Sequence, residues 1–293
     1  MVEVENAVIM AAGMSSRLAP LSYEKPKALL KIRGEVLIER QIRQFLDVGI
    51  DKISVIVGYR KEQFAYLKEK YGVELVDNPY YLERNNHSSL YVVREKLGNT
   101  YVSCADLYFF QNPFQKTVEK PYYSTVYKQG MTGEWCVSSD GEGKIIAVDI
   151  GGSDSWVMLG EALFDKAFSR QMVPLLAHAI QDAGSVDTYW EHLYVSHIRD
   201  MALYEKRAEE RNIMEFDSLE ELRSQAPEYR DDSDSRIMKF IAKQLKCKER
   251  ELDEFKPIKE EEQVEGVSFM CRGVRYVYEY EMQRLRKATE GRR

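Results

Sequence analysis

The stretch that decides the fold is VIMAAGMSSRLAPL, residues 8–21, followed by KPKAL at residues 25–29. An apolar run leads into a turn of small residues, and Arg17 and Lys27 follow that turn. A buried parallel strand that ends in such a turn presents backbone N–H groups to a phosphate. The two cationic side chains would supply the positive charge that a triphosphate requires. This stretch therefore predicts a strand, a phosphate-binding turn and two cations in one site.

Strand and helix patterns alternate through the first half of the chain. The expected strands share short apolar, β-branched runs, at residues 4–12, 52–57, 73–76 and 101–104. The expected helices share amphipathic periodicity, at residues 39–49, 61–71 and 88–96. This alternation predicts an α/β, Rossmann-like fold with a mostly parallel, mixed sheet flanked by helices. Ligands bind beyond the carboxyl ends of such strands, where the turn and Asp106 both fall.

In the second half of the chain the sequence pattern no longer alternates between strand and helix. Strand patterns over residues 121–160 predict a mixed extension of the sheet. The polar run 231–235 predicts a boundary between a catalytic domain, residues 1–229, and a small α+β appendage, residues 230–293. In the appendage we expect a helix over 236–245, an acidic loop over 260–266, and a hairpin that turns at Arg272 and Gly273.

Composition narrows the class of protein. The chain has 293 residues and a formal net charge of −6, which argues against a nucleic-acid binder. An acidic protein that handles a triphosphate must neutralise it locally, so we expect a divalent metal ion as a cofactor. Apolar runs stay short of the ~18 residues that a membrane span needs, so no membrane partner is expected. The acidic N-terminus is unlike a signal peptide and the four cysteines are scattered, so we expect a reduced, cytoplasmic protein.

Three carboxylates are candidate site residues. Asp106 follows the strand at 101–104, and a carboxylate there is costly to bury unless it faces a ligand; the alternative is a turn or helix-capping role. Glu215 and Asp217 alternate with apolar residues and so share one face of a short strand. Asp217 could equally cap the helix that follows it.

The opening stretch resembles the signature of nucleotidyltransferases, L-A-A-G-x-G-[ST]-R-[LM]-x-P-L followed by P-K, with Met10 for the leucine and Ser15 for the second glycine. Further segments resemble bacterial CTP:phosphocholine cytidylyltransferases within the sugar-phosphate nucleotidyltransferase-like family. These segments are residues 58–73, 85–86, 89–91, 101–106, 134–135 and 186–190. The likeness runs, with gaps, from about residue 6 to residue 225.

The resemblance implies Mg²⁺-dependent transfer of CMP from CTP to phosphocholine, giving CDP-choline and pyrophosphate. It implies that Arg17 contacts the β and γ phosphates, and that Lys27, the catalytic lysine, bridges the α phosphate and the acceptor. The metal would lie on Asp106, with Glu215 and Asp217 as further ligands. The expected nucleotide-binding residues are Ala11, Ala12, Gly13, Met14, Ser15, Ser16, Asn85 and Ser88.

An aromatic and acidic set is the candidate acceptor site. A quaternary ammonium is held by aromatic faces, at ~0.5–2 kcal/mol per cation–π contact, and by nearby carboxylates. The candidate walls are Trp135, Tyr189 and Trp190, and the candidate counter-charges are Asp187 and Glu191. The alternative is that these aromatics only pack in the core.

Other functions stay open at this point. The acceptor could be 2-aminoethylphosphonate, phosphoethanolamine or a sugar 1-phosphate, although the Gly-Thr-Ala segment of sugar-phosphate relatives is missing near residues 85–89. A nucleotide-binding regulatory protein is the non-enzyme alternative. The appendage faintly resembles the start of choline-kinase-like phosphotransferases, too short to be a kinase, and we expect it to serve packing or homodimer formation.

Overall fold

The computed structural model describes residues 1–260 and 263–288. The chain folds into two compact units. Unit 1 consists of Met1–Gly13 and Leu37–Met214, and unit 2 of Met14–Val36 and Glu215–Arg293. The sequence predicts a boundary at residues 229/230, whereas the structure groups residues 14–36 and 215–229 with the C-terminal part of the chain.

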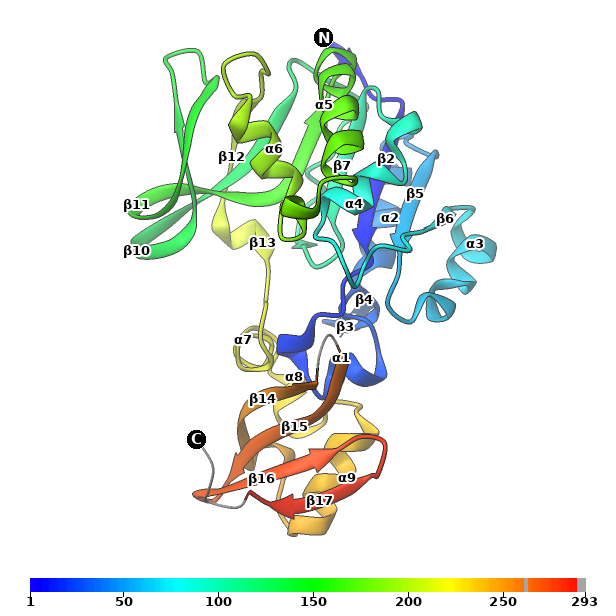
Figure 1. The fold of residues 1–293 in the computed structure, drawn as a ribbon, viewed down its shortest axis with the longest axis vertical. Helices are drawn as coiled ribbons and strands as arrows, with labels where there is room; N and C mark the ends of the chain where they lie inside the picture. The colour runs from blue at the N-terminus through cyan, green and yellow to red at the C-terminus, as the bar shows by residue number, and fades with distance from the viewer. Residues whose placement is uncertain (261–262, 289–293) are drawn as a thin grey trace. The chain divides into compact units, whose positions relative to one another are not determined.

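A seven-stranded mixed sheet forms the centre of unit 1, in the order β12-β10-β11-β7-β2-β5-β6 (Figure 1). Its strands are β2 (Asn6–Ala11), β5 (Ile53–Val57), β6 (Glu74–Asp77), β7 (Thr100–Cys104), β10 (Tyr122–Ser139), β11 (Ile145–Phe164) and β12 (Tyr204–Ala208). β2 is parallel to both β5 and β7, whereas β11 is antiparallel to β7 and β10. The expected mostly parallel, mixed sheet is confirmed.

Helices cover both faces of this sheet (Figure 1). They are α2 (Leu37–Asp47), α3 (Tyr66–Tyr71), α4 (His87–Tyr91), α5 (Lys166–Ala179) and α6 (Trp190–Ser196). Val8 and Met10 of β2 point into a core shared with α4, α5 and α6. On the opposite face, Gln41 of α2 accepts a hydrogen bond from the Ser103 hydroxyl and donates one to the carbonyl of Cys104 at 2.9 Å. α2 is thereby fixed beside the carboxyl end of β7.

Unit 2 combines the signature segment with the C-terminal residues. Residues 14–36 contain η1 (Ser16–Leu18), α1 (Leu21–Glu24), η2 (Lys27–Leu29), β3 (Lys31–Ile32) and β4 (Glu35–Val36). The C-terminal part contains α7 (Leu219–Gln225), α8 (Glu228–Asp231), α9 (Arg236–Leu245), β14 (Leu252–Glu260), β15 (Gln263–Cys271), β16 (Val274–Glu279) and β17 (Arg284–Lys287). The last four strands form an antiparallel sheet in sequence order.

The expected helix and hairpin of the C-terminal part are confirmed by α9 and by the pairing of β15 with β16. Arg272 and Gly273 have φ values of 49° and 76°, and a two-residue turn with both φ values positive matches the twist of the flanking strands. The expected acidic loop is mostly strand, since β14 ends at Glu260 and β15 begins at Gln263. Residues 261 and 262 of that loop lie outside the described residues.

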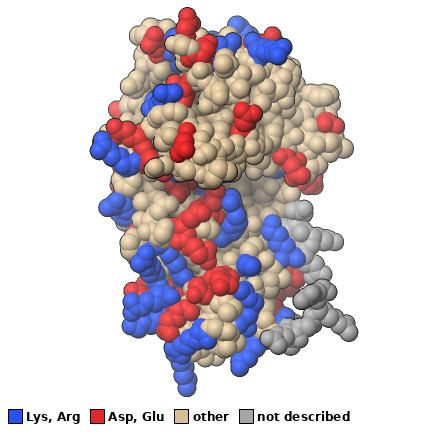
Figure 2. All heavy atoms as spheres, turned by 90° about the vertical axis from the view of Figure 1, so that its left-hand side faces the viewer, with Lys and Arg blue, Asp and Glu red and all other residues tan. Residues whose placement is uncertain are grey.

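Charges of both signs are interspersed over the visible surface of unit 2 (Figure 2). Many of them pair, as in Lys239 with Asp232 at 2.9 Å, but exposed pairs of this kind contribute only about 0–1 kcal/mol each. The apolar core supplies the larger stabilisation, and its fully buried side chains include Ile241, Leu252 and Phe269. Within the described ranges, no helix combines the length and the apolar character needed to cross a bilayer.

Candidate active site

The signature turn connects the two units. Ala11 and Ala12 are buried at the end of β2, and the Ala12 carbonyl accepts a hydrogen bond from the Tyr59 N–H at 3.0 Å. Unit 1 ends at Gly13, and Met14, Ser15 and Ser16 begin unit 2. Ser15 lies in the left-handed region, with φ 49° and ψ 46°, directly before η1. The position where the nucleotidyltransferase signature has its second glycine thus keeps a glycine-like conformation in this chain.

Both signature cations contact one carboxylate within unit 2. Arg17 Nη2 lies 3.1 Å from Asp217 Oδ2, and Lys27 Nζ lies 3.2 Å from Asp217 Oδ1. The Lys27 side chain is only 6% exposed, whereas those of Asp217 and Arg17 are 40% and 69% exposed. A buried ammonium needs a counter-charge, and Asp217 supplies it. The sequence pointed to all three residues but gave no sign that they form this ion-pair cluster.

The alternative role for Asp217, capping the next helix, is wrong. Ser218 is the N-cap of α7, and its hydroxyl accepts a hydrogen bond from the Glu221 N–H. The Glu221 carboxylate in turn accepts one from the Asp217 N–H at 2.8 Å. The backbone of Asp217 is therefore anchored to α7 while its carboxylate stays available to cations.

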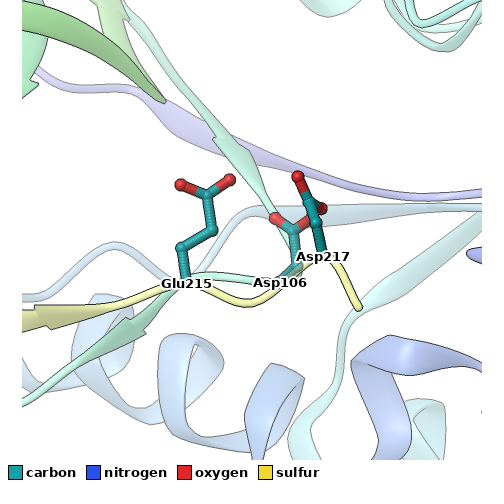
Figure 3. A group of neighbouring side chains, drawn as sticks. All are labelled: Asp106, Glu215 and Asp217. Atoms are coloured by element: carbon teal, nitrogen blue, oxygen red, sulfur yellow. The ribbon is translucent and has the colours of Figure 1, made fainter. Parts of the chain in front are cut away.

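Figure 3 draws the three predicted metal ligands. Asp106 follows β7 in unit 1, while Glu215 and Asp217 are the first and third residues of unit 2. Inside unit 1, β13 (Ile213–Met214) pairs with β8 (Tyr108–Phe109), so that Met214 lies opposite Tyr108. The chain therefore leaves unit 1 next to the segment that carries Asp106. Carboxylate oxygens are the donors that Mg²⁺ and Ca²⁺ prefer, so the chemistry of this set fits a hard divalent cation.

Two of the predicted acceptor residues lie together in unit 1. The ring centroids of Trp135, on β10, and Tyr189, before α6, are 6.1 Å apart in an edge-to-face arrangement. The His192 ring lies 4.5 Å from Trp135 and completes an aromatic cluster in which Tyr189 is 42% exposed. Sequence reasoning missed His192, although its spacing of three residues from Tyr189 places it one helical turn further on.

Trp190 is not a wall of this cluster. Its side chain is buried in the core of unit 1, where it stacks on Tyr123 with ring centroids 5.6 Å apart. α6 begins at Trp190, so consecutive residues point to different sides and Tyr189 faces outward. The core-packing alternative is correct for Trp190.

The two candidate counter-charges differ in environment. Asp187 is exposed in the segment before α6. Glu191 is buried, and its two carboxylate oxygens accept hydrogen bonds from the Asn86 side-chain amide and the Tyr123 hydroxyl, each at 3.0 Å. Burial raises the pKa of Glu191 to about 7, although these hydrogen bonds act to lower it. Glu191 is therefore partly protonated at neutral pH.

The segment predicted to touch the nucleotide, around Asn85 and Ser88, is hydrogen-bonded to the segment before α6. The Asn85 N–H donates to the Val186 carbonyl at 3.0 Å, and the ring of His87 bonds to the Thr188 carbonyl. Ser88 is buried, and its hydroxyl donates to the Asn85 carbonyl at 2.8 Å and accepts from Asn78 at 2.9 Å. Burial lowers the pKa of His87, which favours the neutral ring. Asn85 and the start of α4 thereby hold residues 186–188 in place.

A parallel strand that ends in a small-residue turn, followed by a buried lysine held by a carboxylate, is the arrangement that the nucleotidyltransferase-like signature predicts. The sequence pattern of the MobA-like NTP transferase domain matches residues 7–196, and the chain belongs to this family. The fold and the enzyme class expected from the sequence are thus confirmed.

Named relatives support the expected resemblance. The choline-phosphate cytidylyltransferase of Streptococcus pneumoniae is 37% identical over 217 residues, covering 74% of this chain and 95% of the relative. The 2-aminoethylphosphonate cytidylyltransferase of Lancefieldella rimae is 37% identical over 224 residues, covering 75% and 91%. The solved structure of CTP:phosphocholine cytidylyltransferase from S. pneumoniae superposes with a TM-score of 0.73 at 36% identity, covering 76% of this chain and 98% of that one.

Proposed function

We propose that this enzyme transfers CMP from CTP to phosphocholine and releases pyrophosphate. The observation that carries the nucleotidyl-transfer step is the convergence of Arg17 and Lys27 on the Asp217 carboxylate within unit 2. Two cations gathered on one carboxylate can exchange it for the oxygens of a triphosphate. CTP as the donor is supported by the names of the two relatives that are 37% identical. Because CTP is an intracellular metabolite, a cytoplasmic location is part of the proposal.

The chemistry needs no covalent enzyme intermediate. A phosphate oxygen of the acceptor attacks the α phosphorus in line, and pyrophosphate leaves from the opposite side. Lys27 stabilises the charge that grows on the α-phosphoryl oxygens, and Arg17 holds the leaving phosphates. The burial of Lys27 strengthens this interaction because water screens it poorly.

We propose Asp106, Glu215 and Asp217 as the Mg²⁺ ligands. Bound Mg²⁺ would neutralise phosphate charge and help to orient the triphosphate. The three carboxylates supply oxygen donors, and within unit 1 the β13–β8 pairing places Met214, the residue before Glu215, opposite Tyr108. Once Arg17 and Lys27 contact the triphosphate, the Asp217 carboxylate would be free to bind the metal.

The acceptor site is assigned to the aromatic cluster of Trp135, Tyr189 and His192. An open edge-to-face pair can receive a trimethylammonium group, which binds aromatic faces and makes no strong hydrogen bonds. Asp187 is the better counter-charge, because it is exposed and Glu191 is buried and partly protonated. We exclude Trp190 from the cluster because its ring lies in the core.

A second acceptor, 2-aminoethylphosphonate, is favoured by the relative from L. rimae, which matches at the same identity. The test is pyrophosphate release with CTP, UTP, ATP and GTP, each paired with phosphocholine, phosphoethanolamine, 2-aminoethylphosphonate and glucose 1-phosphate. We expect CTP with phosphocholine to have the highest kcat/KM. A clear preference for a primary amine would replace phosphocholine as the acceptor, and no pyrophosphate with any pair would reject the enzyme function.

A further inference from the structure

The signature segment, residues 14–36, is held within unit 2 by the C-terminal part of the chain. The ring of Tyr23 stacks on Tyr280, with centroids 3.8 Å apart and planes 20° from parallel. The Tyr229 hydroxyl donates to the Lys31 carbonyl at 2.9 Å, and the Arg33 N–H donates to the Glu228 carboxylate at 3.0 Å. The matched domain pattern ends at residue 196, so α9 and β14–β17 lie beyond it.

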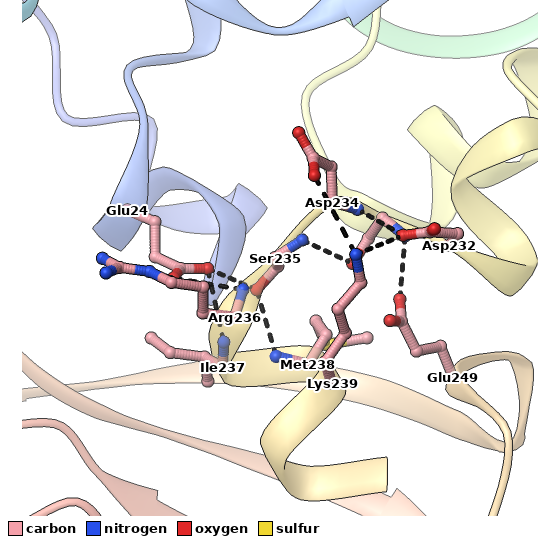
Figure 4. A network of polar contacts seen from close by, with 10 residues as sticks. Glu24, Asp232, Asp234, Ser235, Arg236, Ile237, Met238, Lys239 and Glu249 are labelled. Carbon is pink, nitrogen blue, oxygen red and sulfur yellow. Dashed lines mark hydrogen bonds and ion pairs between the residues drawn. The ribbon is translucent and has the colours of Figure 1, made fainter. Parts of the chain in front are cut away.

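Glu24 contacts several residues at the start of α9 (Figure 4). Its side chain is 14% exposed, and its carboxylate accepts hydrogen bonds from the N–H groups of Arg236, at 3.2 Å, and Ile237, at 3.4 Å. The Ser235 hydroxyl also donates to Glu24, and it accepts from the Met238 N–H at 3.0 Å. The first N–H groups of a helix have no partners within the helix, and a carboxylate there is favoured by the helix dipole. Glu24 and Ser235 together therefore cap α9.

The backbone between Glu24 and Lys27 is short and is constrained by hydrogen bonds. Glu24 is the last residue of α1, which closes with a hydrogen bond from the Lys25 N–H to the Leu21 carbonyl at 3.0 Å. Pro26 follows, with its φ restricted by the ring, and its carbonyl accepts from the Leu29 N–H at 2.9 Å as η2 begins. A shift of the Glu24 carboxylate on α9 would therefore move the backbone of Lys27.

We propose that Glu24 is a positioning residue for Lys27, and that α9 is the fixed support on which it acts. The inference rests on the proposed function, because it assigns Lys27 to the transfer step. The C-terminal part of the chain then supports the active site through Glu24: it holds the signature segment in the position where Lys27 contacts Asp217.

The test compares two carboxylates that accept hydrogen bonds from N–H groups at or just before the start of α9. Glu24→Gln keeps the size of the side chain but turns one oxygen into a donor that faces other donors. Glu249→Gln is the matched control: Glu249 is buried, and it accepts a hydrogen bond from the Ser233 N–H at 2.9 Å. Both variants lose a carboxylate beside the start of α9, but only Glu24 belongs to the signature segment.

We expect Glu24→Gln to lower kcat about 10–100-fold with a much smaller change in KM for CTP, because sub-ångström misplacement of a reacting group acts on the transition state. Glu249→Gln should lower the melting temperature comparably and leave kcat within about twofold. Hydrogen–deuterium exchange of peptides over residues 21–30 should rise in Glu24→Gln and stay unchanged in Glu249→Gln.

Ser235 provides a second, independent pair of variants. Ser235→Ala should lower kcat and Ser235→Thr should restore it, because threonine keeps the hydroxyl that links Glu24 to α9. The double variant Glu24→Gln/Ser235→Ala should be no slower than Glu24→Gln alone, as expected when two residues act through one contact.

Three results would overturn the inference: equal loss of kcat in both glutamine variants, unchanged kcat in Glu24→Gln, or unchanged exchange over residues 21–30 in that variant. Failure of the proposed function shows separately, as wild-type protein that releases no pyrophosphate. The exchange measurement does not depend on that outcome.

Discussion

The ammonium of Lys27 lies 3.2 Å from the carboxylate of Asp217, which is 190 residues further along the chain. The ammonium also lies 5.1 Å from the centroid of the Phe216 ring, which covers it. This long-range ion pair makes the position of Lys27, the proposed catalytic lysine, depend on residues from the C-terminal part of the chain.

Lys27→Ala should lower kcat by at least about 10²–10³-fold, because it removes a cation that stabilises the transition state. The fold should persist, since Arg17 still pairs with Asp217. Lys25→Ala is the control two residues away and should stay within about threefold of wild type. Steady-state pyrophosphate release checks both, and a Lys27→Ala enzyme of near-normal turnover would remove this lysine from the mechanism.

Asp217→Asn should destabilise unit 2 as well as slow the reaction. It leaves the buried Lys27 ammonium without its counter-charge, and we expect a loss of about 1–2 kcal/mol in the free energy of unfolding after allowance for the partly exposed carboxylate. Asp231→Asn is the matched control, because Asp231 pairs with Arg250 at 3.1 Å on the surface. Chemical denaturation should show a change below about 0.5 kcal/mol for this control. An equal loss in the free energy of unfolding in the two variants would contradict a stabilising role for the Lys27–Asp217 ion pair.

Ser15→Gly should stabilise the protein by about 0.5–1 kcal/mol without loss of activity. At φ 49° an L-residue is strained by roughly 1–2 kcal/mol, and glycine relieves this at some cost in unfolded-state entropy. Ser16→Gly, at the first position of η1, is the control and should destabilise. Melting temperatures of the variants and the wild type, compared under identical conditions, test this prediction. A lower melting temperature for Ser15→Gly than for the wild type would contradict the predicted relief of strain.

Trp135→Ala should raise KM for phosphocholine about 3–30-fold, the equivalent of a lost cation–π contact of ~0.5–2 kcal/mol. Trp135→Phe should recover most of that loss because it restores an aromatic face. KM for phosphoethanolamine should change less. Trp190→Phe is the informative contrast: as a core residue it should lower stability more than it alters KM. The reverse pattern would return Trp190 to the acceptor site.

Glu191 should make stability fall as pH rises towards neutrality. Its pKa is raised from 4.5 to about 7 in the folded protein, so the folded state binds more protons than the unfolded chain between these values. The free energy of unfolding therefore decreases with rising pH across that window, by an amount on the order of 3 kcal/mol for a fully buried group. Glu191→Gln should flatten this dependence, as measured by denaturation from pH 5 to 8. The same slope in both proteins would show that Glu191 is not the source.

Local sequence patterns were sufficient to predict the features that depend on residues close together in the chain. The alternation of strands and helices, the signature turn, α9 and the hairpin at Arg272 and Gly273 all follow from short-range periodicity and turn chemistry. Arg17, Lys27 and Asp217 were identified as functional candidates by their residue types and by the signature. Their mutual contacts were not, because a sequence does not state which distant charges meet.

The direction of side chains at the start of a helix also could not be predicted from the sequence. Tyr189, Trp190 and Glu191 are consecutive, yet the first is exposed and the other two are buried. Which of them opens to a ligand depends on the rotation of α6 against the sheet. Composition cannot reveal that rotation, and His192 was missed for the same reason.

The sequence by itself determined the class of fold, the small-residue turn after β2 and the candidate cationic residues, since each depends on residues close together in the chain. Only the tertiary structure decided that residues 14–36 belong with the C-terminal part, that Asp217 joins Arg17 to Lys27, and that Glu24 caps α9. These features are contacts between segments about 200 residues apart. They arise when buried charges and unpaired helix N–H groups must find partners, and that requirement is met only once the chain has folded.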